Sequence, residues 1–284
     1  MTKKYPVFLM SGRDRNIRRE IMIQLDPDEK YKGKCLLPLL GKPVIQWVVD
    51  ELVQSKYIEG IYSLGVSRED INLGDKVEYV PVDFYADLSE KWLAGYEYLK
   101  AQGKEFSDYV ICMADTPAMT IDKIEEFFEK LTKMEGYDFI LSLVPYELSK
   151  KWFPNAGRVV GNFRDYQIFP GEMMTYSAHS IKTGKKVFDD ISRLRRQRSF
   201  WAVAWYVFRN PRTWPKMFKI LLKIAKLDDA VRILELAFKV KMGYILIDDL
   251  GFGLDMDVPQ NYGQLEEYML KTKLKGKNIE RSII

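Results

Sequence analysis

Short apolar runs alternate with longer amphipathic segments through the first half of the chain. Several runs have the length and residue types of buried strands, at 7–10, 58–66, 77–82, 108–113 and 138–144. Between them, apolar positions recur three and four residues apart, which predicts helices over 44–53, 89–99 and 120–134. This alternation predicts an α/β fold, with a mostly parallel sheet in a three-layer α/β/α arrangement.

The second half of the chain has a different pattern. From Pro145 onward, prolines and glycines interrupt the sequence and predict loops with only short extended pieces. Residues 183–240 then have an almost continuous helical pattern, followed by a strand at 244–247 and a helix over 258–271. We interpret 1–284 as a single domain with a helical insertion at 183–240, whose final strand and helix return to the sheet.

Composition narrows the class of protein. Hydrophobic residues make up 47% of the 284 positions and charged residues 30%, which is typical of a chain that buries a full core. The net charge of +4 is too small for a dedicated nucleic-acid binder, so no nucleic-acid partner is expected. Two cysteines exclude a disulfide framework, and the longest apolar run, 200–208, is too short to cross a bilayer as a helix. We therefore expect a cytoplasmic globular protein.

The chain has a single histidine, His179, with no nucleophile signature around it. A Ser-His-Asp hydrolase or a site with several histidine ligands is therefore not expected, and we interpret His179 as a surface or loop residue. Any catalysis is expected to depend on carboxylates, lysines and arginines.

The turn after the first strand has the residue types of an anion-binding loop. It contains Met10, Ser11, Gly12 and Arg13, and small residues after a buried strand let backbone amides approach a phosphate. Arginines at 13, 15, 18 and 19 add charge suited to a polyphosphate. The turn is neither a P-loop nor a dinucleotide fingerprint, because it has one glycine. A plain turn with solvated arginines explains it equally well.

A second segment, 34–43, reads Lys-Cys-Leu-Leu-Pro-Leu-Leu-Gly-Lys-Pro. Lys34 precedes an apolar stretch, a Gly-Lys-Pro turn and a predicted helix. From that position its ammonium could return to the first loop and neutralise a phosphate. An edge segment with two surface lysines is the alternative.

Acidic residues follow two of the predicted strands. Asp115 comes after the strand at 108–113, and Asp255 and Asp257 lie between the last strand and the last helix. Ligands of open α/β sheets bind beyond the carboxyl ends of the strands, where two carboxylates can share one Mg²⁺ with phosphate oxygens. Aspartate before Thr-Pro is also common in turns and helix caps.

In order and spacing, these three segments resemble the GT-A-fold nucleotidyltransferases, specifically the MobA-like NTP transferases. The Lys34–Pro43 segment is the most specific of the three. The resemblance covers roughly the first 145 residues and the last 40. A second loop glycine, typical of the family, is missing here.

The resemblance implies a Mg²⁺-dependent enzyme that transfers a nucleoside monophosphate from an NTP to a phosphorylated small molecule, such as a sugar or polyol phosphate. CTP, GTP and UTP are the candidate donors, and pyrophosphate is released. Met10, Ser11, Gly12 and Arg13 would hold the triphosphate, and Lys34 would stabilise charge on the α-phosphate, so Arg13 and Lys34 are the expected catalytic residues. Asp115 and Asp257 would hold Mg²⁺. Asp87 and Ser89 lie in the stretch that contacts the base in such enzymes.

The second half is expected to shape the acceptor pocket. The candidate acceptor-binding residues are Arg158, Gly171, Glu172, Arg195, Arg196 and Arg198. A solvated basic helix face explains the arginine cluster as well.

Aromatic and apolar residues between 200 and 226 are interleaved with lysines and arginines. Basic amphipathic helices of this kind lie on anionic membranes, which makes peripheral membrane contact one hypothesis. Core packing or a homodimer interface explains the same pattern.

Two alternative functions remain at this point. Asp255-Met256-Asp257 matches the Asp-x-Asp metal motif of a GT-A glycosyltransferase that uses a nucleotide sugar. A non-catalytic nucleotide-binding module would account for the altered first loop.

Overall fold

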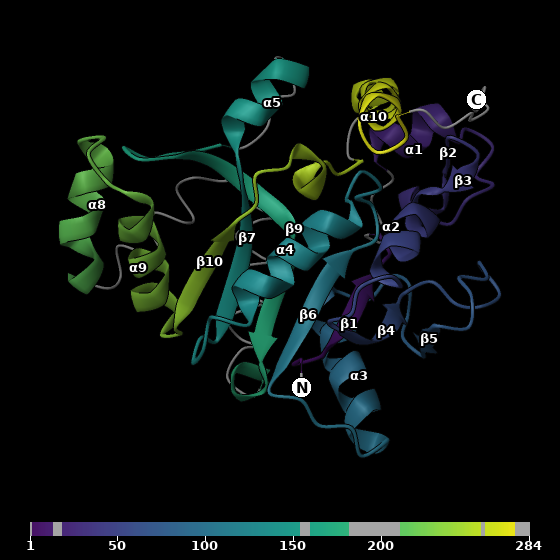
Figure 1. The fold of residues 1–284 in the computed structure, drawn as a ribbon, viewed down its shortest axis with the longest axis horizontal. Helices are drawn as coiled ribbons and strands as arrows, with labels where there is room; N and C mark the ends of the chain where they lie inside the picture. The colour runs from purple at the N-terminus through teal and green to yellow at the C-terminus, as the bar shows by residue number, and fades with distance from the viewer. Residues whose placement is uncertain (1, 14–18, 154–159, 182–210, 257–258, 276–284) are drawn as a thin grey trace.

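One large sheet organises the molecule. The computed structural model describes residues 2–13, 19–153, 160–181, 211–256 and 259–275. The sheet has the strand order β10-β7-β9-β6-β1-β4-β5, which can be followed from one side of Figure 1 to the other. Its strands are β1 (Tyr5–Met10), β4 (Ile58–Leu64), β5 (Val77–Val80), β6 (Asp108–Met113), β7 (Phe139–Pro145), β9 (Gln167–Ser177) and β10 (Met242–Leu246).

Parallel pairing dominates, as the sequence predicts. β1 pairs in parallel with β4 and β6, β4 with β5, and β7 with β10. Only β9 runs against its neighbours β6 and β7 in this path, and a short strand, β8 (Gly161–Asn162), pairs antiparallel with it. The predicted fold class is confirmed.

The prediction of loops after Pro145 is wrong for the described residues there. Helix α5 (Tyr146–Trp152) follows β7 directly, and β9 is an eleven-residue strand inside the sheet, between β7 and β6. Pro170 and Gly171 made this stretch look irregular, but both lie where the register of β9 against β7 shifts. A β-bulge tolerates proline and glycine, which explains how a strand carries both.

Helices cover both faces of the sheet. In β1, Tyr5, Val7 and Leu9 belong to one core cluster, and Phe8 and Met10 to another. The first cluster includes residues of α2 (Val44–Leu52), α4 (Ile121–Leu131) and α10 (Pro259–Lys271). The second is packed by α3 (Leu88–Ala101) and α9 (Leu227–Phe238). This alternation along β1 produces the predicted three layers, because every β1 side chain is buried on one face or the other.

The remaining elements are short. They are α1 (Glu20–Leu25), the strands β2 (Pro38–Leu39) and β3 (Lys42–Pro43), the 3-10 helices η1 (Lys34–Leu36), η2 (Pro211–Thr213) and η3 (Leu250–Gly253), and helix α8 (Trp214–Leu221). Of the predicted insertion at 183–240, the part from 211 is described, and there η2, α8 and α9 are helical as expected.

The sheet brings two predicted site segments together. Met10, the last residue of β1, pairs with Met113, the last residue of β6. The amide of Ala114 donates to the carbonyl of Met10 at 3.0 Å, so the Ser11 loop and the Asp115 loop leave the sheet side by side.

Candidate active site

A cavity of about 200 Å³ opens beyond the carboxyl ends of β1 and β6. It has four basic and four acidic residues in its lining: Arg13, Arg19, Lys34, Lys91, Asp87, Asp115, Glu172 and Asp255. Met10, the last residue of β1, and Ser11 and Gly12 of the loop after it are also part of the lining. The position matches the place where open α/β sheets bind ligands.

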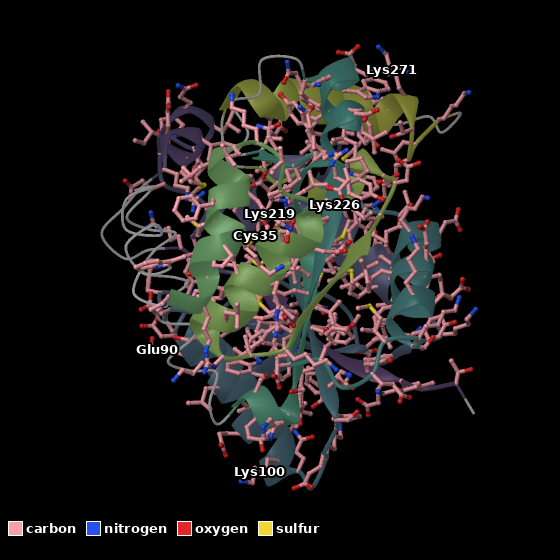
Figure 2. The ribbon with its side chains drawn as sticks, turned by 90° about the vertical axis from the view of Figure 1, so that its left-hand side faces the viewer. Cys35, Glu90, Lys100, Lys219, Lys226 and Lys271 are labelled. Carbon is pink, nitrogen blue, oxygen red and sulfur yellow. The ribbon has the colours of Figure 1, made fainter. Side chains whose placement is uncertain are left out.

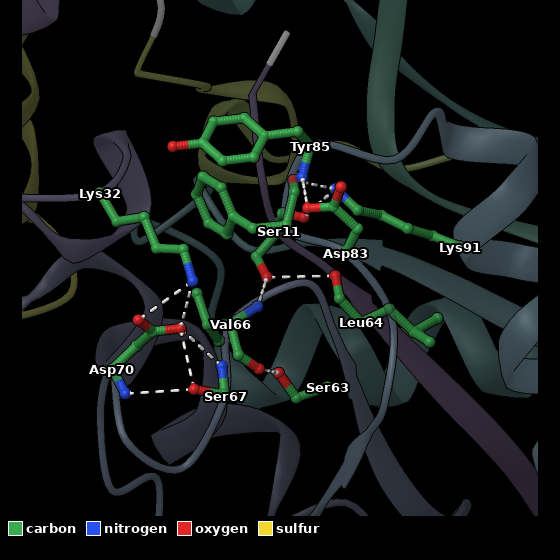
Figure 3. Close-up of polar contacts among 11 residues, drawn as sticks. Ser11, Lys32, Ser63, Leu64, Val66, Ser67, Asp70, Asp83, Tyr85 and Lys91 are labelled. Carbon is green, nitrogen blue, oxygen red and sulfur yellow. Dashed lines mark hydrogen bonds and ion pairs between the residues drawn. The ribbon is translucent and has the colours of Figure 1, made fainter. Parts of the chain in front are cut away.

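The first loop is fixed to the neighbouring strand by Ser11. Its hydroxyl donates to the carbonyl of Leu64 at 3.1 Å and accepts from the amide of Val66 at 2.9 Å (Figure 3). Gly12 has a φ of 136°, a conformation that favours glycine. A Cβ at Gly12 would lie 2.0 Å from the Nζ of Lys91 and 2.3 Å from the carbonyl oxygen of Phe84. The loop therefore requires glycine for both conformation and space.

Lys91 is a site residue that the sequence reasoning missed. Its side chain is buried, and its ammonium donates to the carbonyls of Ser11 at 2.6 Å and Phe84 at 2.7 Å (Figure 3). It thus joins the first loop to the loop before α3 and places a positive charge at the cavity wall. The available signal was its spacing, because Lys91, Gly95 and Leu99 share the buried stripe of α3. A lysine in such a stripe is uncommon and needs partners.

Arg13 enters the cavity from the end of the first loop. Its guanidinium lies over the ring of Tyr85, 5.6 Å from the centroid. The Nε of Arg13 is buried and has no hydrogen-bond partner within the described part of the chain. Such a donor is available to an anion, in agreement with the predicted phosphate role.

Lys34 and Asp115 form an ion pair in the wall of the cavity. Their side chains are 15% and 10% exposed, so this pair is largely shielded from water. Lys34 is positioned by η1, whose neighbouring residues Cys35 and Leu36 are buried. Lys34 and the first loop line the same cavity, and the ammonium of Lys34 pairs there with Asp115. Lys42 points elsewhere, since it pairs with Asp50 of α2 at 2.6 Å.

The second acidic segment also reaches the cavity. Asp255 is part of its lining, and the amide of Met256 donates to the carbonyl of Asp115 at 3.2 Å. Asp257, the second predicted metal ligand, lies outside the described residues. No group of three histidine, cysteine or carboxylate side chains is close enough to form a metal site within the described ranges. Asp115 and Asp255 fit Mg²⁺ nevertheless, because this ion takes one or two carboxylates and completes its shell with phosphate oxygens and water.

Glu172 reaches the cavity through the bulge in β9. Leu141 pairs with Met174 and Leu143 with Pro170, so three residues of β9 oppose Ser142 alone. Within this bulge, the hydroxyl of Ser142 donates a hydrogen bond to the carbonyl of Met173 at 2.5 Å. Glu172 lines the cavity as a result.

The other predicted acceptor residues divide into two groups. Gly171 is buried, and a Cβ there would lie 2.3 Å from the Oγ of Ser142, so it packs inside the sheet and does not line the cavity. Arg158, Arg195, Arg196 and Arg198 lie outside the described residues.

The two candidate base-contacting residues differ in position. Asp87 lines the cavity and is the N-cap residue of α3, with Glu90 accepting from its amide at 2.9 Å. Ser89, predicted to begin this helix, lies in its first turn, is buried and is not part of the cavity lining.

Neither cysteine is suited to be a nucleophile. Burial, with the nearby charge of Asp115, raises the pKa of Cys35 to about 12, and burial raises the pKa of Cys112 well above its usual range. His179 is exposed and is not part of the cavity lining. The charged side chains of the cavity lining are lysines, arginines and carboxylates.

Helix α10 and the turn after it donate hydrogen bonds to two segments that border the cavity, the one after Lys34 and the loop after Asp115. The ammonium of Lys273 donates to the carbonyls of Pro117 and Met119, each at 2.8 Å, in the loop that follows Asp115. The hydroxyl of Tyr262 donates to the carbonyl of Pro38 at 2.7 Å, in the segment that follows Lys34. Helix α10 and its following turn thus connect the Lys34 segment with the Asp115 loop.

Comparisons with known proteins were made by sequence and by structure. No protein-family model matches the chain. The 3-deoxy-manno-octulosonate cytidylyltransferase of Coxiella burnetii (strain RSA 331) is 25% identical over 190 residues, covering 63% of this chain and 71% of the relative. The bifunctional protein GlmU of Bacillus subtilis is 26% identical over 151 residues, covering 51% of this chain. That match spans only 29% of GlmU.

Solved structures share the fold. A hypothetical transferase from Thermus thermophilus superposes with a TM-score of 0.67 at 17% identity, covering 92% of this chain and all of the other. CMP:2-keto-3-deoxy-manno-octonic acid synthetase, solved with CTP, gives a TM-score of 0.52 at 12% identity, covering 95% of this chain and 99% of the other.

These findings confirm the predicted fold and the predicted class of enzyme. The relatives include cytidylyltransferases and GlmU, which supports the broader superfamily and not the MobA-like branch in particular. At that level, the chain resembles the nucleotidyltransferase superfamily in both sequence and fold.

Proposed function

We propose that the protein transfers a nucleoside monophosphate from an NTP to a small phosphorylated acceptor, with Mg²⁺ as cofactor and pyrophosphate as the second product. The observation that supports this most directly is the Lys34–Asp115 ion pair in the cavity that the Gly12 loop borders. Similarity to cytidylyltransferases makes CTP the favoured donor among CTP, GTP and UTP.

Different residues of the cavity lining would bind the β- and γ-phosphates, the α-phosphate and the metal ion that such a reaction needs. The amides around Gly12, with Arg13, would bind the β- and γ-phosphates, because oriented backbone dipoles and a guanidinium both favour polyphosphate. Lys34 would lie at the α-phosphate and stabilise the charge that develops there. Asp115 and Asp255 would hold Mg²⁺, which neutralises the triphosphate when bound. Binding would therefore require Lys34 to exchange Asp115 for a phosphate oxygen.

The bond changes are those of an in-line displacement. An oxygen of the acceptor attacks the α-phosphorus, the bond from that phosphorus to the oxygen bridging the β-phosphorus breaks, and pyrophosphate leaves. An acceptor phosphate attacks as an anion, so no proton has to be removed. This agrees with a cavity lining that has no histidine. Glu172, on the β9 side, would orient acceptor hydroxyl groups.

The test is release of pyrophosphate from each NTP in the presence of Mg²⁺ and a panel of sugar and polyol phosphates. The proposal expects release from one NTP with one acceptor class, and its loss in Asp115→Asn. Glu147→Gln, on α5, is the matched control because this residue is not in the cavity lining. Hydrolysis of nucleotide sugars without pyrophosphate release would instead support the glycosyltransferase alternative.

A further inference from the structure

An exposed apolar patch lies on α8 and the turn that follows it, beyond the β10 edge of the sheet (Figure 1). Among the described residues, eight large hydrophobic side chains are exposed, and five of them fall between 214 and 224. We call these five the α8 patch: Trp214, Phe218, Leu221, Leu222 and Ile224. Such a concentration on one short segment differs from the scattered exposed apolar residues of ordinary surfaces.

The patch is separate from the face by which α8 joins the molecule. Met217 is buried and packs with Ile233 of α9, supported by Ile220 and Ala237. Phe218 and Leu222 are instead 60% and 67% exposed. The helix therefore presents one apolar face to the molecule and a second to its surroundings.

The surroundings of the patch are basic. Residues 211–226 contain no acidic residue and five basic ones: Arg212, Lys216, Lys219, Lys223 and Lys226. Lys216 and Lys219 pair with Asp229 of α9, whereas Lys223 and Lys226 form no ion pair within the described chain. Figure 2 faces this side of the molecule and labels Lys219 and Lys226.

We propose that the α8 patch docks the protein onto the surface of an anionic lipid bilayer. Exposed aromatic and aliphatic side chains flanked by lysines are the combination that inserts at a bilayer interface while the ammonium groups contact anionic headgroups. Among the residues that the structure describes, none of the helices has the length and hydropathy that crossing a bilayer requires.

The positive charge around the α8 patch argues against a second copy of this chain as its binding partner. A two-fold interface centred on the patch would bring the same unpaired lysines of both copies together, and like charges repel. An anionic surface supplies the opposite charge across the whole patch. This inference does not depend on the nucleotidyltransferase proposal, since the cavity and the patch share no residues.

The test is flotation of the full chain with two kinds of vesicle, one of phosphatidylcholine alone and one of phosphatidylcholine and phosphatidylglycerol in equal amounts. Binding is expected only to the second kind, and it is expected to weaken as salt is added. Phe218→Glu with Leu222→Glu is expected to weaken it about tenfold or more per side chain. Lys223→Gln with Lys226→Gln is expected to weaken it about fivefold per lysine. Ile23→Glu, at another exposed apolar position, is the matched control and is expected to bind normally.

Equal binding of the wild type to both vesicles, or no binding at low salt, would overturn the proposal. So would a stable dimer in solution that Phe218→Glu with Leu222→Glu disrupts. An unchanged thermal melting curve for each variant shows that lost flotation does not reflect lost folding.

Discussion

At the scale of single residues, the cavity depends on charges that are held before any substrate enters. Lys34 is paired with Asp115, and Lys91 is held by two backbone carbonyls. A charge that is held in place beforehand, as that of Lys91 is, needs little reorganisation during the reaction, which favours electrostatic stabilisation of a transition state. Lys34 has to exchange Asp115 for a phosphate oxygen first.

Replacing Lys34 by glutamine is expected to lower kcat about 100- to 1000-fold, because the ammonium at the α-phosphate is lost. It also leaves Asp115 without its ion-pair partner, so a stability effect accompanies the catalytic one. The double variant Lys34→Gln with Asp115→Asn separates the two, since it removes both charges. We expect it to recover thermal stability and to remain inactive in the pyrophosphate assay. Recovered activity in the double variant would contradict the role of Lys34.

Gly12→Ala is expected to destabilise the protein by roughly 1–3 kcal/mol and to raise KM for the NTP, because φ is positive and Lys91 and Phe84 fill the space of the Cβ. Gly74→Ala provides the matched comparison, with a φ of 92° and nothing within 4 Å of the added Cβ. Gly74→Ala introduces the strain of a positive φ without a steric clash, and Gly74 does not line the cavity. Calorimetric NTP titrations that gave equal affinities for both variants would contradict the proposed phosphate loop.

At the scale of elements, α10 and its following turn determine how far apart the catalytic segments stand. Lys273 is 5% exposed and forms an ion pair with Glu51 at 3.2 Å, while Glu51 also accepts from the amide of Ile121 at the start of α4. Burial lowers the pKa of Lys273, and the charge of Glu51 opposes that shift. The buried Lys273–Glu51 pair therefore fixes the part of the loop that follows Asp115, up to the start of α4.

Lys273→Met is expected to reduce the free energy of unfolding by roughly 2–4 kcal/mol, because it leaves the Glu51 carboxylate and the carbonyls of the Asp115 loop without their buried partner. It is also expected to weaken Mg²⁺-dependent NTP binding more than NTP binding without Mg²⁺, since the loop positions Asp115. Lys271→Met removes an exposed ion pair with Glu267 and a cation–π contact with Trp152, and it serves as the control, with a change below about 1 kcal/mol. An equal loss of binding with and without Mg²⁺ would indicate that Lys273 supports the fold alone.

The junction of α8 and α9 is expected to be sensitive to acid. Asp229 accepts from Lys216 at 2.8 Å and Lys219 at 3.1 Å, and the hydrogen bond from Lys216 lowers the pKa of Asp229 to about 2 from 3.8. A lowered pKa in the folded state means that this contribution to stability is complete above pH 3.8 and is lost as the pH falls towards 2. Urea midpoints measured across this range are expected to fall more steeply for the wild type than for Asp229→Asn. Parallel curves for the two proteins would contradict the assignment.

At the scale of the whole molecule, much of the first half was predictable because its strands are buried on both faces and its helices have one apolar stripe. β6 matches its predicted bounds, and α2 and β7 differ from theirs by a residue or two. β9 was missed because its bulge places Pro170 and Gly171 inside a strand, and periodicity alone does not distinguish that from a loop.

The candidate site was predictable where a residue closely follows a strand. Gly12 and Asp115 are each the second residue after a strand, and the parallel register of β1 and β6 brings them together. Lys91 and Lys273 were not predictable in this way, because Lys91 reaches the carbonyl of Ser11 and Lys273 that of Pro117, both distant in sequence. Only the folded chain shows which carbonyls they reach.

The most direct test of the central claim is a thermal-shift measurement with CTP, GTP, UTP and ATP, each with and without Mg²⁺, on the wild type and on Asp115→Ala. A ligand at about 100 times its Kd adds roughly 2.7 kcal/mol of stability, which a melting curve resolves. We expect one NTP to stabilise the wild type, and Asp115→Ala to lose the Mg²⁺-dependent part of that shift. Equal Mg²⁺-dependent shifts in both proteins, or no shift with any NTP, would contradict the assignment of this cavity as a nucleotidyltransferase site.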